Sequence, residues 1–219
     1  MKSILHLKFI ALYIIFGFLC VFTTAMLAEE LIQNQLEEDT SRTLYREATL
    51  IASDYLPSYF SDSSSVQSVQ AQLAAMRLYL DSSLWFVSSD GTMITSSNLE
   101  GTSSPEAIED FDPAEIGGSQ YITGTYHGYF DEDMITVMAP VTEGFSTSGY
   151  LLIHSPLSAI EENCSEIMVS VYICLGVIFL LSFIFLLGFQ FFVYNPLKQI
   201  SEAAKQYASG NLDYEIPVY

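Results

Sequence analysis

The chain has 219 residues, half of them hydrophobic, and a formal net charge of −19 from 26 acidic and 7 basic side chains. This charge argues against nucleic acid as a partner, because a nucleic-acid surface needs a positive patch. The charges are also unevenly distributed. Residues 9–27 and 167–194 carry none, a pattern that excludes a single soluble globular domain as the whole architecture.

The first uncharged stretch predicts a membrane helix over residues 9–28. Its 19 uncharged residues would span about 28 Å as a helix, close to the ~30 Å core of a bilayer. A cleaved signal peptide is the alternative, since "TTAMLAEE" supplies small residues, but the run exceeds the usual signal core of about 7–15 residues. The second stretch predicts a membrane helix over 167–194, long enough to tilt or to emerge among the headgroups.

The flanking charges predict the orientation. The segment 29–166 holds 23 acids against three arginines, a net of −20, whereas the rest of the chain holds four lysines against three acids, a net of +1. Positive residues favour the cytoplasmic side, so we expect residues 1–8 and 195–219 in the cytoplasm and 29–166 outside the cell. The chain is therefore expected to cross the membrane twice.

Apolar residues recur every three or four positions from residue 29 to Tyr55, which predicts a helix that Pro57 and "SDSSS" end. Residues 66–80 repeat this helical spacing. In "SLWFVSSDGTMITSSN", Asp90-Gly91 separates two short apolar runs and predicts a hairpin, since glycine tolerates the positive φ of a tight turn. An acidic insert over 99–119, with one or two helical turns, follows.

Three more strands are predicted from "QYITGTYHGYF", "DMITVMAPVTE" and "GYLLIHSPLSAI". A helix from Ser158 then leads directly into the second crossing. We therefore expect an α+β fold in which two transmembrane helices flank a five-stranded antiparallel sheet, with a long N-terminal helix across one face of the sheet.

The segments "WFVSSDGTMITSS", "ITVMAPVTE" and "GYLLIHSPLSAI", in this order between two crossings, resemble the extracytoplasmic PAS-like (single Cache) sensor domains of bacterial receptors. The resemblance implies a small ligand held between the sheet and the helical insert. Strand alternation lets only one parity of side chains face such a pocket, and these residues could instead simply form the core. The candidate ligand-binding residues are Trp85 (or Phe86), Tyr121, Thr123, Tyr126, Met134, Thr136 and Met138.

Charged candidates for a ligand or metal site are few. None of the predicted strands carries a cation, so a dicarboxylate ligand is not expected, and a neutral, cationic or protein signal is favoured. His127 lies near Asp131 and Asp133, but "HGYFDED" reads as a polar turn rather than a metal site. His154 is interpreted as a hydrogen-bonded histidine at a strand end. The acid excess suits either a solvated surface or the binding of cations.

The last segment, 195–219, begins with an Asn-Pro after an aromatic belt and continues with a helical stripe. The segment resembles the first helix and connector of a HAMP relay domain in four features: a helix start at Pro196, Ile200, Ala203 and a helix end at Gly210-Asn211. The alternative is a basic juxtamembrane tail without a relay function. "ISEAAKQYASGNLDYEIPVY" is similar to sensor histidine kinases of Gram-positive bacteria. These resemblances make Pro196, Ile200, Ala203 and Gly210 candidate relay residues.

The resemblance implies a multi-pass, homodimeric receptor that is embedded in the lipid bilayer of a bacterial plasma membrane and senses an unidentified extracellular signal. Its kinase domain, which would use ATP and Mg²⁺ and pass phosphate to a response regulator, is expected beyond residue 219. No catalytic residue, metal ligand or cofactor site is expected within the chain itself. A chemoreceptor or a diguanylate cyclase with the same PAS-like and HAMP layout is the alternative.

Overall fold

A computed structural model describes residues 2–60, 65–97, 107–117 and 121–210. The chain divides into two compact units. One, the helical unit, consists of residues 1–28 and 167–219; the other, the sheet unit, consists of residues 29–166. The predicted extended stretch "LDYEIPVY" and two parts of the acidic insert, residues 99–106 and 118–119, lie outside the described residues.

The helical unit contains the two apolar stretches. They belong to α1 (Lys2–Asp54) and α5 (Leu157–Phe189), and both are long and apolar enough to cross a membrane. Their large apolar side chains are exposed: Phe18 is 71% exposed and Phe185 is 76% exposed. A helix that is apolar on all sides and unburied is matched to lipid rather than to water, so both helices indicate a membrane protein.

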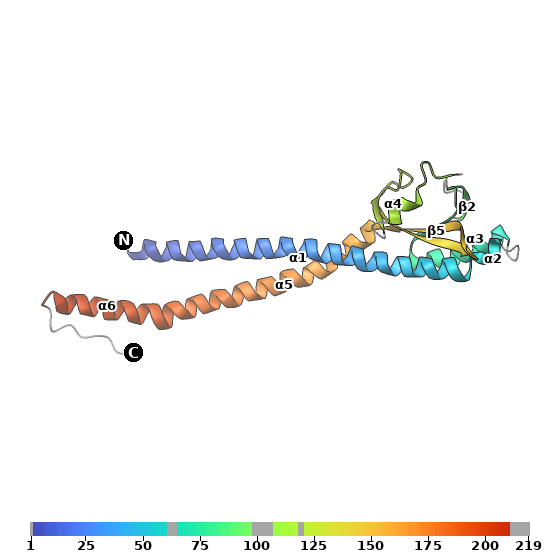
Figure 1. Ribbon diagram of the computed structural model, residues 1–219. Helices are drawn as coiled ribbons and strands as arrows, with labels where there is room; N and C mark the ends of the chain where they lie inside the picture. Colours follow the sequence, from blue (N-terminus) through green and yellow to red (C-terminus); the bar gives the residue numbers. More distant parts are fainter. Residues whose placement is uncertain (1, 61–64, 98–106, 118–120, 211–219) are drawn as a thin grey trace. The chain divides into compact units, whose positions relative to one another are not determined.

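The sheet unit contains a five-stranded antiparallel sheet, which confirms the predicted α+β fold (Figure 1). Its strands lie in the order β2-β1-β5-β4-β3. The long strands β4 and β5 pair along most of their length. The hairpin that joins them turns at Gly144, which has a φ of +62°. The strand bounds are β1 (Ser83–Ser88), β2 (Met93–Ser96), β3 (Ile122–Gly124), β4 (Met134–Glu143) and β5 (Ser146–Pro156).

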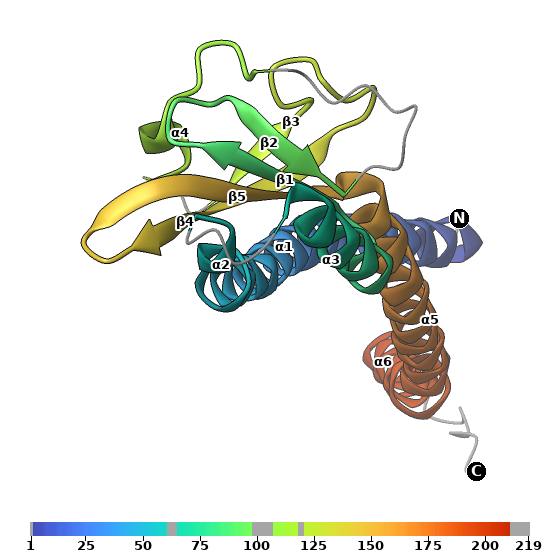
Figure 2. The same ribbon diagram turned by 90° about the vertical axis from the view of Figure 1, so that its right-hand side faces the viewer.

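The two faces of the sheet have different coverings (Figure 2). α1, α2 (Pro57–Phe60) and α3 (Val66–Leu80) lie on one side, which we call the helix face. α4 (Pro113–Gly117) and the segment between β3 and β4 lie on the other side, which we call the loop face. The helix-face core includes Ala48, Leu73, Phe86, Val137 and Ile153. The loop-face core includes Trp85, Val87, Ile108, Ile116, Tyr126, Met138 and Leu152.

The predicted hairpin between β1 and β2 is present and turns at Asp90-Gly91. Asp90 Oδ1 accepts a hydrogen bond from Thr92 N at 3.0 Å. Hydrogen bonds from the backbone and side chain of Thr92 hold the pKa of the Asp90 carboxyl below its usual value. Gly91 has a φ of +86° and lies against Phe111, so a Cβ at this position would stand 2.6 Å from Phe111 Cβ. Both the backbone angle and the close approach therefore require glycine here.

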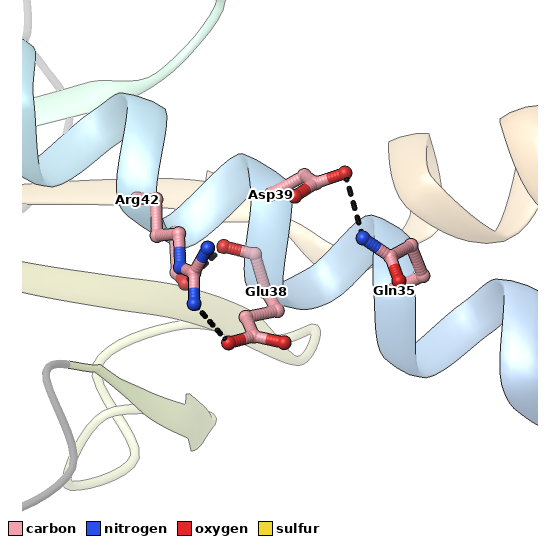
Figure 3. Close-up of polar contacts among 5 residues, drawn as sticks. Gln35, Glu38, Asp39 and Arg42 are labelled. Atoms are coloured by element: carbon pink, nitrogen blue, oxygen red, sulfur yellow. Dashed lines mark hydrogen bonds and ion pairs between the residues drawn. The ribbon is translucent and has the colours of Figure 1, made fainter.

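Polar side chains form short ladders along the sheet-unit part of α1 (Figure 3). Arg42 Nη2 lies 2.6 Å from Glu38 Oε1, one helical turn away. Gln35 Nε2 donates to Asp39 Oδ2 at 3.2 Å with the same spacing. Such i,i+4 pairs contribute about 0.2–0.5 kcal/mol each, and they suit a helix surface that faces water.

The sequence predicted a new helix starting at Pro196, but the helix after the second apolar stretch does not start afresh there. α5 continues through a π-helical turn, η1 (Gln190–Tyr194), directly into α6 (Asn195–Ala208). Asn195 N donates to Gln190 O, five residues back. A proline ring clashes with the carbonyl four residues before it, and the wider π turn relieves that clash while the chain stays helical.

Candidate functional site

Five aromatic side chains gather on the loop face and form what we call the aromatic cluster: Trp85, Tyr126, Tyr129, Phe130 and His154. Trp85 comes from β1 and His154 from β5, which pair directly in the sheet. The other three come from the segment between β3 and β4. The cluster thus joins the centre of the sheet to the loop that covers it.

The rings of the cluster are in direct contact. The centroids of Trp85 and His154 are 4.5 Å apart, and Phe130 stacks on Trp85 at 5.3 Å with an interplanar angle of 21°. Tyr126 and Phe130 approach His154 at 4.8 and 4.9 Å. Aromatic contacts of this kind contribute about 0.5–1.5 kcal/mol each beyond the area they bury, so the covering loop is held down by ring packing.

His154 is the buried polar centre of the cluster. Its side chain is fully buried, and Nδ1 lies 2.8 Å from Thr136 Oγ1 on the neighbouring strand. Burial lowers the pKa of His154 to about 3, so the imidazole is neutral at physiological pH. Nε2 of His154 and Nε1 of Trp85 are both buried, and neither has a hydrogen-bond partner among the described residues.

The loop over the cluster has an unusual backbone. Tyr126, His127 and Gly128 have φ angles of +42°, +53° and +79°. A left-handed conformation costs an ordinary residue about 1–2 kcal/mol, so two such residues in a row need support from their surroundings. Phe130 N donates to Thr125 O at 3.2 Å, and His127 Nε2 lies 3.4 Å from Glu115 Oε2 on α4.

Tyr126 itself is buried and remains protonated. Burial is the main cause that raises the pKa of its phenol, and the nearby Glu115 carboxylate and Tyr129 raise it further. Tyr129 anchors the other end of the loop, because its hydroxyl accepts a hydrogen bond from Glu109 N at 3.1 Å. Backbone bonds, ring packing and the polar contact between His127 and Glu115 therefore hold the loop closed, and no acidic or basic residue is buried beneath it among the described residues.

The structure divides the predicted ligand-binding residues between the two faces. Trp85, Tyr126 and Met138 belong to the loop-face core, and Met134 and Thr136 share the parity of Met138 along β4. Tyr121 packs against the helix-face core, as does Phe86. Thr123 pairs with Ile135, has the parity of Tyr121 and is exposed. The predicted set is therefore brought together in part, with Tyr121, Thr123 and Phe86 outside the cluster.

Three members of the cluster were not among the predicted site residues: Tyr129, Phe130 and His154. "QYITGTYHGYF" was predicted to be a strand and "HGYFDED" a polar turn. β3 ends at Gly124, so the predicted strand is too long, whereas the turn is present within the covering loop. His154 is hydrogen-bonded, as predicted. The sequence offered one usable signal, the density of aromatic residues in "TYHGYF" next to an apolar strand. Among the described residues, no group of three His, Cys, Asp or Glu side chains is arranged to hold a metal ion.

The predicted relay residues lie on or just after α6. Pro196 occupies its first turn, Ile200 is 59% exposed and Ala203 is buried. Gly210 follows the end of the helix with a φ of +90°, the conformation typical of a helix terminator. The neighbouring Asn211, predicted to share this role, lies outside the described residues.

Comparisons with known proteins find a likeness in structure only. No protein-family model matches the sequence, and neither does any curated protein. Among solved structures, the chain is similar to the sensor domain of the histidine kinase DctB from V. cholerae, with a TM-score of 0.47 and 20% sequence identity. The alignment covers 64% of this chain and 59% of the length of the DctB chain.

Proposed function

We propose that this chain is the sensing and transmembrane-relay portion of a two-component sensor histidine kinase. The sheet unit would face the outside of a bacterium and receive the signal, and residues 195–219 would form the first part of a HAMP relay. A kinase domain beyond residue 219 would use ATP and Mg²⁺ and would pass phosphate to a response regulator. The receptor would act as a homodimer in the plasma membrane, with both termini in the cytoplasm.

One observation carries the proposal: the covering loop is tied to the helix that enters the apolar stretch. The loop continues into residues 131–133, and Leu157 N, the first residue of α5, donates to Asp133 O at 2.9 Å. Ser158 Oγ donates to Glu132 Oε2 at 3.0 Å. A displacement of the loop is therefore passed to the first turn of α5 through two short hydrogen bonds.

The covalent chain supplies a second route to the same helix. β5 carries His154 and ends at Pro156, and α5 begins at Leu157 with no residue between them. A strand in the middle of a sheet and a helix are both stiff, so a shift at His154 is not absorbed by a flexible linker. A ligand that favours one arrangement of the loop and β5 would shift the population of two α5 positions, and the π turn before Pro196 would accommodate the movement.

Disulfide crosslinking between two copies of the chain tests the relay. Ser170→Cys would be introduced after replacement of the three native cysteines, and the rate of disulfide formation would be measured in native membranes. Tyr126→Ala, which removes the centre of the loop, should change that rate. Thr147→Ala, on the exposed surface of β5, should leave it unchanged.

The outcomes separate the parts of the proposal. No crosslinking at Ser170→Cys, or at single cysteines placed in turn at the other positions from 167 to 180, would refute the homodimer. Crosslinking that is identical in Tyr126→Ala and in the parent would refute a connection between the loop and α5, provided that circular dichroism shows the variant to be folded. The coding sequence downstream of residue 219 decides among a kinase, a chemoreceptor and a diguanylate cyclase.

A further inference from the structure

The aromatic cluster contains two buried nitrogen atoms that native proteins rarely leave unused. Trp85 Nε1 and His154 Nε2 lack a hydrogen-bond partner among the described residues, although Trp85 is 1% exposed and His154 is fully buried. Most buried side-chain polar atoms have a partner, and exceptions call for an explanation. The two rings are in contact, with centroids 4.5 Å apart, so both nitrogen atoms belong to the same small region of the cluster.

The chemistry of these atoms restricts what can bind. The indole N–H of Trp85 is a donor only, so it needs an acceptor such as a carbonyl oxygen. His154 Nδ1 is engaged with Thr136 Oγ1, and Nε2 of the neutral ring is either a donor or an acceptor according to the tautomer. A group that carries both an acceptor and a donor, as a primary amide does, satisfies the pair in either tautomer.

The surroundings exclude both signs of charge. Among the residues that the structure describes, no Asp, Glu, Lys or Arg side chain is buried, and the loop-face core is made of aromatic and aliphatic side chains. The three arginines of the sheet unit lie on α1 and α3, which cover the opposite face. The carboxylate of Glu115, which raises the pKa of Tyr126, is exposed and lies 3.4 Å from His127 Nε2. A charged ligand would thus be buried without a counter-ion, which is strongly unfavourable.

The shape of the site follows from its rings. Phe130 stacks nearly parallel to Trp85, while Tyr126 and Tyr129 meet Trp85 at interplanar angles of 72° and 73°. A flat ligand can replace Phe130 on the indole face if the loop 125–130 moves outward. The positive φ angles of Tyr126 and His127 make that movement less costly, because opening releases backbone strain.

We propose that the aromatic cluster binds a neutral, planar molecule with an amide-like group, hydrogen-bonded to Trp85 Nε1 and His154 Nε2 and admitted by outward movement of the loop 125–130. The proposal rests on the sensing role proposed above and names the class of signal. Ring stacking would supply affinity, and the two nitrogen atoms would supply selectivity for an uncharged polar group over a carboxylate or an ammonium group.

The chain provides its own probe, because Trp85 is its one tryptophan. The full chain in lipid nanodiscs would be titrated with benzamide, benzoate and benzamidine, which share a shape and are neutral, anionic and cationic at pH 7. We expect a saturable change of Trp85 fluorescence with benzamide, with a dissociation constant on the order of 1 mM for so small a ligand. Benzoate and benzamidine should bind at least about tenfold more weakly.

His154→Phe keeps a planar ring but removes Nε2, and it should weaken benzamide binding by about tenfold, the effect of one hydrogen bond. Thr147→Ala is the surface control and should bind as the parent does. The comparison of the three probes on the parent chain needs no variant and stands even if His154→Phe fails to fold. No saturable change with benzamide, or binding of a charged probe as tight as that of benzamide, would overturn the proposal.

Failure of this proposal and failure of the relay give different results. Benzamide binding that leaves the crosslinking rate at Ser170→Cys unchanged would refute the relay and retain the ligand class. A crosslinking rate that responds to Tyr126→Ala, in a chain that does not bind benzamide, would refute the ligand class alone.

Discussion

Replacement of His154 by asparagine should remove much of the acid sensitivity of the sheet unit. Asparagine can still reach Thr136 Oγ1 with its short amide, but it does not titrate. In the folded chain burial lowers the pKa of His154 from 6.5 to about 3. The unfolded chain therefore binds a proton below pH 6.5 that the folded chain does not accept. As far as His154 is concerned, the free energy of unfolding is at its full value above pH 6.5 and decreases as the pH falls from 6.5 toward 3.

The magnitude follows from the two pKa values. Because the side chain is fully buried, the shift needs no discount for solvent screening. Between pH 7 and pH 5, His154 should lower the free energy of unfolding of the parent chain by about 2 kcal/mol, and His154→Asn should not show this loss. The many acidic groups titrate alike in both chains, so their contribution cancels in the difference.

The measurement is urea unfolding of the full chain in nanodiscs at pH 7 and pH 5, followed by Trp85 fluorescence. His127→Gln is the matched control, because it removes a histidine that is partly exposed and leaves His154 in place. This control should keep the loss that is due to His154. An equal loss of stability in the parent and in His154→Asn would refute the assignment of His154 as a buried neutral group.

The remaining predictions concern the core, the hairpin, the π turn and the ligand. Ile153→Ala truncates a fully buried side chain and should lower the free energy of unfolding by about 2–5 kcal/mol. Leu78→Ala, at a side chain that is 86% exposed, should change it by less than about 0.5 kcal/mol. Equal urea midpoints for the two variants would contradict the assigned core. Gly91→Ala forces a Cβ against Phe111 at a φ of +86° and should cost more than about 1 kcal/mol by the same assay. Pro196→Ala removes the clash that the π turn relieves, so the turn should revert to α-helix and α6 should rotate by about 100° relative to α5, the angle of one residue. A cysteine-accessibility scan of α6 should show the rotated pattern. An unchanged pattern would show that the proline does not cause the π turn. Calorimetric titration with succinate should show no binding, and micromolar affinity would contradict the absence of a cationic anchor on the loop face.

Much of the fold could be predicted because its signals are local. The helix over 66–80 and the bend at Asp90-Gly91 depend on side chains within a few positions of each other, and the structure has both. The polar turn in "HGYFDED" was predicted, but the preceding strand was predicted to be too long because "TYHGYF" has the composition of a strand. The left-handed conformation of Tyr126 and His127 depends instead on packing against Trp85 and His154. Local preference was overridden there by contacts with residues distant in sequence.

The end of the second apolar stretch shows the same division. Pro196 predicts a disturbed helix in any context, since its ring cannot fit an ordinary α-helical turn. Whether the chain responds with a break or with a π turn depends on the residues after the proline and on which hydrogen bonds remain available. Here Asn195 N bonds to Gln190 O, and the helix continues.

Composition and short-range periodicity were enough to predict the two apolar stretches, the acidic segment between them and the order of most helices and strands. Which parity of each strand faces the loops depends on the packing of the folded chain. Alternation divides a strand into two sets of side chains, but the pairing of Trp85 with Leu152 and of Thr136 with His154 places one set under the loop and the other under α1 and α3. That choice joins Trp85 and His154 in one buried cluster, and it arises from packing between distant segments rather than from any local pattern.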